Sequence, residues 1–327
     1  MSLTVNHQTN DISNATGTIL VNGVAVGGDN TPPPRGDRAV VGGGHLGSFT
    51  NVIQYFAIPS TGNATDFGDL TVARGAAASC SSGSRGVFGG GTDGSIKDTI
   101  DYVTIATTGN ATDFGNLSLG KRDLAACSNG SRGVFAGGAD AAQTTDYNVM
   151  EYITISTTGN VTDFGDLLLS NQGLAGLSDG SRGVFGGGGS RDSGSFVRLN
   201  TIQYITIATT GNATDFGDLT QVTSNIAGSA NGTRGVFGGG YSSSRVNVIQ
   251  YITIASTGNA TDFGDLTVQR SALGSAANDT RATFIGGFES PGYRNEIDYV
   301  TIANTGNATD FGDLVMGTNQ PSACSGT

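Results

Sequence analysis

The chain has 327 residues, of which 54 are glycine and none is tryptophan, and its formal net charge is −11. This negative charge argues against a protein that wraps nucleic acid or lies on anionic lipid. No stretch approaches the 18 apolar residues of a membrane span, and the N-terminus lacks the pattern of a secretory signal, so we expect no membrane insertion. Short Val, Ile and Phe runs between turn residues predict an all-β protein.

Residues 1–37 differ from everything that follows them. Leu3–Asn6 and Thr18–Val21 are expected to form short strands, and Pro32–Pro34 to form a stiff spacer. A segment of this size cannot bury a core of its own, so we expect it to dock on the rest of the chain or on another protein. We therefore treat residues 1–37 as an anchor segment.

Residues 38–327 form a repeat array. The ten residues Thr-Gly-Asn-Ala-Thr-Asp-Phe-Gly-Asp-Leu begin at Thr61 and recur nearly unchanged at intervals of 47, 50, 52, 47 and 48 residues. A period in this range indicates a repeat architecture. The later copies begin at Thr108, Thr158, Thr210, Thr257 and Thr305.

Each repeat contains four strand-like pieces, A to D. Piece A is small and apolar, as at 76–80, and a tight turn leads from it to piece B, the Arg-Gly-Val-Phe-Gly-Gly-Gly that begins at Arg85. Piece C surrounds a tyrosine such as Tyr204, and piece D carries Asp-Phe-Gly-Asp-Leu. Six four-stranded antiparallel blades of this kind predict a β-propeller. The repeated phenylalanines are expected to pack between blades: Phe67, Phe114, Phe164, Phe216, Phe263 and Phe311.

The two ends of the array complement each other. The chain ends in a piece A without a piece B, whereas the first piece B, at 38–44, has no piece A. We therefore expect the C-terminal strand to complete the first blade, which leaves the ring without two open sheet edges. The expected blades are 38–70 with 315–327, 71–117, 118–167, 168–219, 220–266 and 267–314.

A glycine doublet, a later tyrosine and then a bulky aromatic residue recur in each repeat, for example at Gly90-Gly91, Tyr102 and Phe114. This pattern resembles the kelch family of propellers over residues 38–327. The chain departs from that family in having Phe at the position of its Trp and in a longer gap of 12 residues after the Tyr. Galactose oxidase shares the architecture, but the paired His and the Cys–Tyr crosslink of its copper site have no match here.

Sequence variation between the repeats falls in the B–C loops and the D–A segments, which an up-and-down blade places on one face of the disc. Variable loops on a fixed scaffold are typical of a recognition surface, although neutral drift would also vary them. Six of the seven aromatic residues outside the repeat pattern lie in B–C loops, and cations accompany them. The expected ligand-binding residues are Phe49, Arg74, Lys97, Arg122, Tyr147, Arg191, Phe196, Arg198, Tyr241, Arg245, Arg270, Phe288, Tyr293 and Arg294.

Few residues could carry catalysis or hold a metal. His7 and His45 are the only histidines, so we expect no catalytic site, no metal site and no cofactor. The repeated Asp pairs, such as Asp66 and Asp69, are interpreted as turn hydrogen bonding or salt bridges to the repeated Arg, with a repeated Ca²⁺ site as the alternative. Cys80, Cys127 and Cys324 share one repeat position and are expected to be reduced core cysteines.

Residues 5–18 look like the leader of structural proteins from tailed bacteriophages, particularly those of cyanobacteria. The repeat Tyr-Ile-Thr-Ile-Ala-Thr-Thr-Gly-Asn-Ala-Thr-Asp-Phe-Gly-Asp-Leu also resembles repeats in virion-associated proteins of such phages. The resemblance implies a place on the surface of the phage particle.

These observations favour one function over two others. We expect a tail, fibre or capsid appendage that contacts other virion proteins through residues 1–37 and binds a host surface glycan or protein through its variable loops. The first alternative is an architectural virion decoration or assembly protein without receptor binding. The second is an enzyme that degrades surface polysaccharide.

Overall fold

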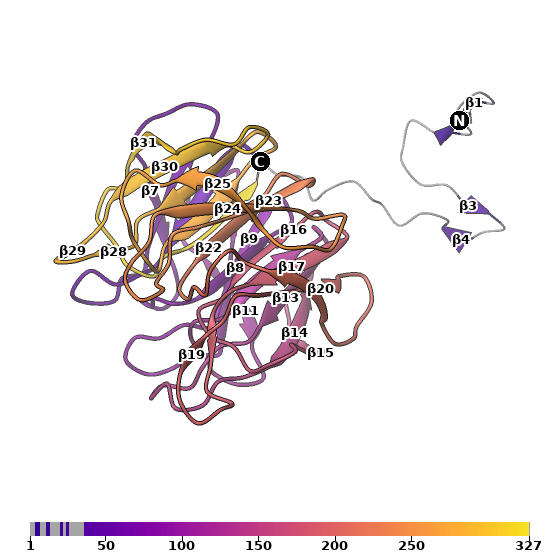
Figure 1. Ribbon diagram of the computed structural model, residues 1–327. Coiled ribbons are helices and arrows are strands. Elements are labelled where there is room, and N and C mark those ends of the chain that lie inside the picture. The colour runs from indigo at the N-terminus through magenta and orange to yellow at the C-terminus, as the bar shows by residue number, and fades with distance from the viewer. Residues whose placement is uncertain (1–3, 7–10, 14–19, 22–23, 26–35, 327) are drawn as a thin grey trace.

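The computed structural model describes residues 4–6, 11–13, 20–21, 24–25 and 36–326, and side chains within 36–326. Residues 36–326 form an all-β ring of six four-stranded antiparallel blades, as the sequence predicted (Figure 1). Near the N-terminus, β1 (Thr4–Asn6) pairs with β2 (Asp11–Ser13) and β3 (Leu20–Val21) with β4 (Val24–Ala25). The predicted anchor role of residues 1–37 falls largely outside the described residues.

Each blade presents its strands in the order A, B, C, D from the centre of the ring to its rim. Blades 1 to 3 comprise β32 (Ser322–Gly326), β5 (Arg38–Gly42), β6 (Val52–Ala57) and β7 (Thr65–Asp69); β8 (Ala78–Ser81), β9 (Arg85–Gly89), β10 (Thr99–Thr104) and β11 (Thr112–Asn116); and β12 (Ala125–Ser128), β13 (Arg132–Ala136), β14 (Val149–Thr154) and β15 (Thr162–Asp166). Blades 4 to 6 comprise β16 (Ala175–Ser178), β17 (Arg182–Gly186), β20 (Thr201–Thr206) and β21 (Thr214–Asp218); β22 (Ala227–Ala230), β23 (Arg234–Gly238), β24 (Val248–Thr253) and β25 (Thr261–Asp265); and β26 (Gly274–Ala277), β27 (Arg281–Ile285), β30 (Glu296–Thr301) and β31 (Thr309–Asp313). Two short hairpins extend B–C loops: β18 (Gly189–Ser190) with β19 (Val197–Arg198) in blade 4, and β28 (Phe288–Glu289) with β29 (Gly292–Tyr293) in blade 6.

The C-terminal strand closes the ring. β32 pairs antiparallel with β5, from Ser322 opposite Gly42 to Gly326 opposite Arg38, so the prediction of a shared first blade is confirmed. A second device closes the ring at one mouth of the central channel, where one residue per blade donates its backbone N–H to the carbonyl of the equivalent residue in the preceding blade. This circle of six hydrogen bonds, 2.7–3.0 Å long, runs through Ala76, Asp123, Gly173, Asn225, Ala272 and Gln320.

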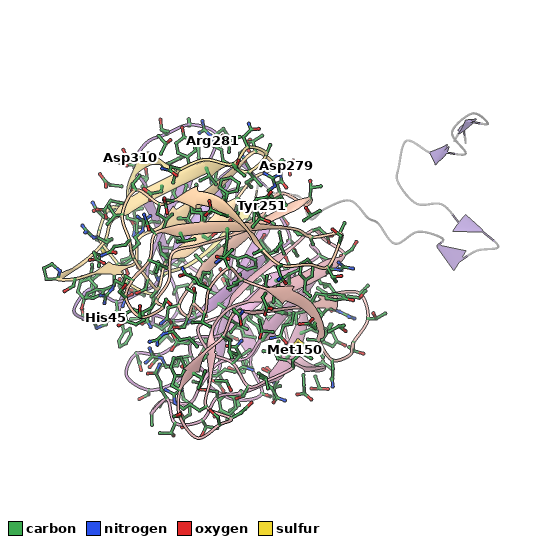
Figure 2. All side chains as sticks on the ribbon, in the orientation of Figure 1. His45, Met150, Tyr251, Asp279, Arg281 and Asp310 are labelled. Atoms are coloured by element: carbon green, nitrogen blue, oxygen red, sulfur yellow. The ribbon has the colours of Figure 1, made fainter. Side chains whose placement is uncertain are left out.

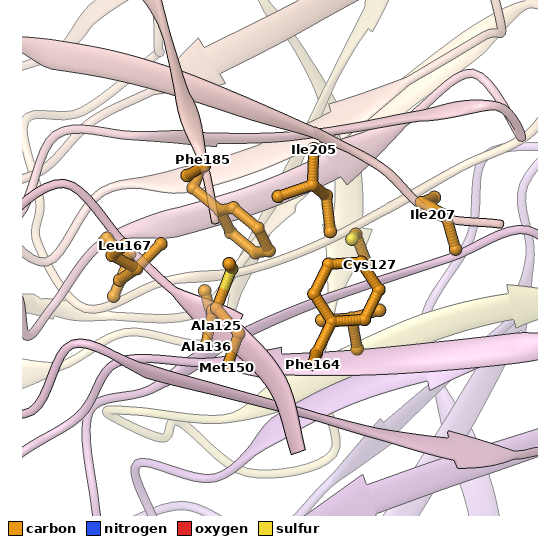
Figure 3. Packing of buried hydrophobic residues seen from close by; sticks show 12 residues of the cluster. Ala125, Cys127, Ala136, Met150, Phe164, Leu167, Phe185, Ile205 and Ile207 are labelled. Carbon is orange, nitrogen blue, oxygen red and sulfur yellow. The ribbon is translucent and has the colours of Figure 1, made fainter. Parts of the chain in front are cut away.

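Hydrophobic packing lies between the blades rather than inside any one of them. Six clusters of buried residues each join two neighbouring blades, and Figure 3 shows the cluster shared by blades 3 and 4. In it Cys127 and Phe164 lie beside Ile205 and Ile207 (Figure 3). All six repeated phenylalanines are only 2% exposed, which confirms their predicted place between blades.

The three cysteines are free and buried, as predicted. They line a central cavity of about 110 Å³ formed by the six A strands. Burial raises the pKa of each thiol, that of Cys324 to about 12. Because the thiolate is the reactive form, these cysteines are inert packing residues in the folded protein.

The repeated arginine links each blade to the next one. Arg182, for example, lies 4.3 Å from the ring centre of Tyr204 in its own blade and donates from Nη1 to the carbonyl of Ile254, 2.7 Å away in blade 5. The equivalent arginines of the other blades make the same two contacts. None of the salt bridges among residues 36–326 joins a repeated arginine to an Asp pair, so the predicted salt bridges between them are wrong.

The C–D turns cover the outer edge of each neighbouring blade. In blade 2, the backbone N–H groups of Gly109 and Ala111 donate to Phe67 and Asp69 on strand D of blade 1, and the Asn110 side chain accepts from the Asp69 N–H. A Cβ on Gly68 would lie 2.5 Å from the Gly109 carbonyl, which explains the glycine of Asp-Phe-Gly. The repeated motif therefore joins blades and protects strand edges from pairing with other chains.

Candidate binding face

B–C loops and D–A segments lie together on one face of the disc. In every blade a residue of the D–A segment forms a β-bridge with the B–C loop, as Ser224 does with Tyr241. The A–B and C–D turns lie together on the other side, where Ile105 N–H donates to the Ser84 carbonyl. We call the first side the variable face and the second the uniform face. His45 of the variable face and Asp279 of the uniform face lie on opposite sides of the molecule in Figure 2.

Both ends of the propeller lie on the uniform face. Strand β5 begins there at Arg38, opposite Gly326 of β32, and the carbonyl of Asp37 accepts a hydrogen bond from Ile58 in a C–D turn. The chain therefore enters the ring on the side away from the variable loops. The described residues at this entry lie on the uniform face and do not cover the variable face.

Aromatic and cationic side chains of neighbouring B–C loops stack in a continuous belt across blades 4, 5, 6 and 1. Arg198 lies 5.7 Å from the ring centre of Phe196 and 4.6 Å from that of Tyr241. Arg245 lies 5.9 Å from Tyr241 and 4.5 Å from Phe288. Each guanidinium thus connects the aromatic rings of two different loops, an arrangement that fixes the loops relative to one another.

The belt continues through blade 6 into blade 1. Phe288 lies 5.7 Å from Tyr293, Tyr293 lies 5.5 Å from His45, and His45 lies 4.8 Å from Phe49, each measured between ring centres. At its other end Arg191 lies 4.7 Å from Phe196 and pairs with Asp146 of blade 3 at 2.8 Å. His45 was not among the predicted site residues, because a single histidine in a Gly-rich loop gave no sign that it would join two aromatic rings from different blades.

Most of the predicted site residues lie half-buried on the variable face, and several of the cations already have acidic partners. Lys97 pairs with Asp93, Arg122 with Asp123 and Arg294 with Glu296. Asp123 also accepts from Gln143 and from Gln320, so Arg122 belongs to a polar cluster at the channel mouth. Tyr147 is half-buried near Asp140, and burial raises its pKa. Tyr293 is the most exposed of the predicted aromatics, at 38%.

Arg74 and Arg270 are not on the surface, and their assignment to the binding face is wrong. Both side chains are fully buried and form ion pairs, Arg74 with Asp101 at 2.8 Å and Arg270 with Asp298 at 2.9 Å. Desolvation lowers the pKa of both guanidiniums, and the paired carboxylates oppose that shift. These arginines stabilise the base of the D–A segments. They cannot contact a ligand unless the D–A segment unfolds.

A comparison between blades identifies this buried position. Blades 2, 3 and 6 have an acid just before the repeated Tyr and a cation in the D–A segment, with Lys121 and Glu151 forming the third pair at 2.8 Å. Blades 1, 4 and 5 have Gln at the first position and a neutral residue at the second, as with Gln250 and Thr223. Acid and Gln alike accept a D–A backbone N–H. This covariation was available in the sequence and would have removed Arg74 and Arg270 from the predicted site.

The large exposed hydrophobic side chains among residues 36–326 all lie on the variable face. Within residues 36–326, seven large hydrophobic residues are strongly exposed, and all of them lie in B–C loops or D–A segments. They are Leu119, Leu168, Leu169, Val197, Val222, Tyr293 and Val315. Large exposed hydrophobic residues therefore distinguish the variable face from the uniform face.

The described residues set limits on other chemistry. They contain no group of three or more His, Cys, Asp and Glu side chains that could hold a metal ion. No helix within them is long and apolar enough to cross a membrane. The comparisons with known proteins add no family: no family model matches the chain, and no curated protein matches it either.

Proposed function

We propose that the protein is a structural component of a phage virion, carried through residues 1–37, whose variable face binds a glycan of the host surface. The observation that carries the binding role is that the large exposed hydrophobic side chains among residues 36–326 all lie on the variable face. The phage setting is supported by the sequence resemblance of residues 5–18 and of the repeat.

The cation–aromatic belt supports glycan as the ligand. Aromatic rings offer flat apolar surfaces that pack against the C–H faces of sugars, while guanidinium and amide groups beside them donate hydrogen bonds to hydroxyls. In this belt Tyr241 and Tyr293 come from different blades and are held by stacking with neighbouring side chains. Rings fixed in advance lose little conformational entropy when a ligand binds.

The entry of the chain on the uniform face supports display of the variable face. Gly36 and Gly326 both lie at the uniform end of blade 1, so an attachment made through residues 1–37 leaves the variable loops pointing away from it. This geometry suits an appendage that is mounted by one side and makes contacts with the other.

The test is binding of the full-length chain to intact candidate host cells and to their purified surface polysaccharides. A variant with Tyr147, Phe196, Tyr241 and Tyr293 replaced by Ser should lose saturable binding while keeping its thermal unfolding midpoint within a few degrees. The control variants Thr158→Tyr and Thr257→Tyr add bulk to exposed C–D turns of the uniform face and should bind normally. Unchanged binding by the four-site variant would contradict the proposal.

A purely architectural role is the second candidate, and one feature of the uniform face favours it. Hollows of about 330 Å³ in blade 3 and 190 Å³ in blade 5 lie beside the C–D turns and are lined by repeat residues, including Asn160 and Asn259. A symmetric partner in a particle could contact such repeated features. Under this alternative Thr158→Tyr and Thr257→Tyr would reduce retention of the chain on particles, and the four-site variant would not.

A further inference from the structure

Two arginines of the belt differ from the other cations of the variable face. Among the described residues, Lys97, Arg122, Arg191 and Arg294 each form an ion pair, and Arg74, Lys121 and Arg270 are paired in the interior. Arg198 and Arg245 take part in none of these pairs. The Nε atom of each is buried without a hydrogen-bond acceptor, as is the Nε of Arg294, whose Nη1 pairs with Glu296. A buried N–H donor that lacks an acceptor is uncommon, because desolvated donors normally find partners within the protein.

These two arginines flank a single aromatic ring. The guanidinium carbons of Arg198 and Arg245 lie 4.6 and 5.9 Å from the ring centre of Tyr241, and Phe196 and Phe288 support them from either side. The backbone of Tyr241 is itself fixed, since its N–H and carbonyl both bond to Ser224, at 2.8 and 3.0 Å. Three loops from blades 4, 5 and 6 therefore bring two unpaired cations to one rigid, half-exposed ring.

The nearby acids do not neutralise this pair. Asp192 in the same loop as Arg198 accepts hydrogen bonds from the backbone and side chain of Ser170. Glu289, beside Phe288 in the sequence, accepts from Gln269. Neither acid is within ion-pair distance of Arg198 or Arg245. Both guanidiniums are therefore without an ion-pair partner among the described residues, in a chain whose net charge is −11.

We propose that Arg198, Tyr241 and Arg245 form a subsite for an acidic sugar residue, so that the glycan of the proposed function carries negative charge at this point. The sugar lies against Tyr241 beside the two guanidiniums that stack on its ring, and its oxyanion accepts hydrogen bonds from them. Guanidinium groups bind planar and tetrahedral oxyanions well, so a carboxylate or a sulfate ester would satisfy the same donors. This inference rests on the proposed function and gives it a substrate class.

The experiment measures binding of the full-length chain to four polysaccharides immobilised at equal density. Polygalacturonate and its methyl ester share one backbone with free or blocked carboxylates, and dextran sulfate and dextran share another with or without sulfate. We expect binding to at least one anionic member of these pairs and at least tenfold weaker binding to its neutral counterpart. The preferred member identifies the oxyanion as carboxylate or sulfate.

Single variants then locate the site. Arg198→Gln and Arg245→Gln should each weaken binding to the preferred anionic polysaccharide about tenfold, the loss expected for one charge-assisted hydrogen bond. Thr158→Glu and Thr257→Glu are the matched controls, because they lower the net charge by the same amount on exposed C–D turns of the uniform face. They should change affinity less than threefold. Thermal unfolding of all four variants shows whether each remains folded.

Three results would overturn the inference. Equal losses in all four variants would show a diffuse charge effect rather than a subsite. Binding to neutral polysaccharides or to host cells that Arg198→Gln and Arg245→Gln leave unchanged would refute the acidic subsite while sparing the proposed function. An absence of binding to every polysaccharide and to candidate host cells would contradict both.

Discussion

The two faces of the disc use the same residue types for different purposes. On the uniform face, Arg182 and its five equivalents make identical contacts, each stacked on a tyrosine and bonded to a carbonyl of the next blade. On the variable face, Arg198 stacks on Phe196 of its own loop and on Tyr241 of the next blade, and its Nε has no hydrogen-bond acceptor. An arginine repeated in every blade belongs to the scaffold, whereas one that the other blades do not share is free to serve recognition.

Variation between blades does not by itself mark a recognition residue, because some residues in variable segments also belong to the scaffold. Arg74 and Arg270 occur in D–A segments, yet they are buried beside acids in strand C. A cation occurs at this D–A position only in the blades where strand C carries an acid, so the difference between blades reflects this ion pair and not a ligand. Variants that separate scaffold residues from residues of the variable surface therefore test this difference between the two faces.

Replacing Arg74 with Thr should lower the free energy of unfolding by about 3–5 kcal/mol, because Asp101 would remain buried without its cation. The double variant Arg74→Thr with Asp101→Gln recreates the neutral pair of blade 5, Thr223 with Gln250, and should recover most of the loss. Urea unfolding monitored by circular dichroism measures both. A single variant as stable as the parent would show that Arg74 does not hold the D–A segment.

Arg182→Ala and Arg198→Ala compare the two faces within blade 4. The first removes a charged hydrogen bond to the Ile254 carbonyl and the stacking on Tyr204, and should cost about 2–3 kcal/mol. The second removes only stacking at the surface and should cost less than about 1 kcal/mol. Chemical denaturation of the pair gives the comparison. Equal losses would mean that the belt is as structural as the repeated arginines.

Gly183→Ala tests packing between blades. A Cβ at Gly183 would lie 2.5 Å from the Sγ of Cys127 in blade 3, so the variant should be destabilised by about 1–3 kcal/mol. Combining it with Cys127→Ala reproduces the pairing of Ala39 with Ala276 between blades 1 and 6, and part of the loss should return. The thermal midpoints of the parent, both single variants and the double variant complete the cycle. Additive losses would contradict direct contact.

Ala277→Ser should be slightly stabilising, by about 0.5–1 kcal/mol. Ser325 at the equivalent position donates from Oγ to the Ala277 carbonyl, and Ser81 and Ser128 do the same to their neighbours around the channel. A hydroxyl at position 277 should donate in the same way to the Ala230 carbonyl. A small rise in the thermal midpoint is the expected result, and a fall would show that the channel wall has no room for the oxygen.

The fold was predictable because the same sequence pattern occurs six times along the chain. Copies of one motif at near-constant intervals predicted the six blades, and the unmatched strand pieces at 38–44 and 322–327 predicted the closure by β32. The inter-blade place of residues such as Phe164 followed from their repetition. Position within the repeat was enough for these predictions, because identical environments recur around the ring.

The candidate site was predictable only in part. The choice of face and most of its side chains could be inferred, but Arg74 and Arg270 were misplaced because loop position was taken to mean exposure. The stacking of Arg198 on Tyr241 and of Tyr293 on His45 depends on distances between loops of different blades. Those distances are set by loop conformation, and no repeat pattern encodes them.

Hydrogen exchange of the full-length chain, with and without the polysaccharide that it binds best, shows which face the ligand occupies. We expect protection at backbone amides of the B–C loops and D–A segments in blades 4, 5, 6 and 1, with the C–D turns unchanged. Protection confined to the C–D turns would contradict this expectation, because the ligand would then occupy the face on which the blades are nearly identical.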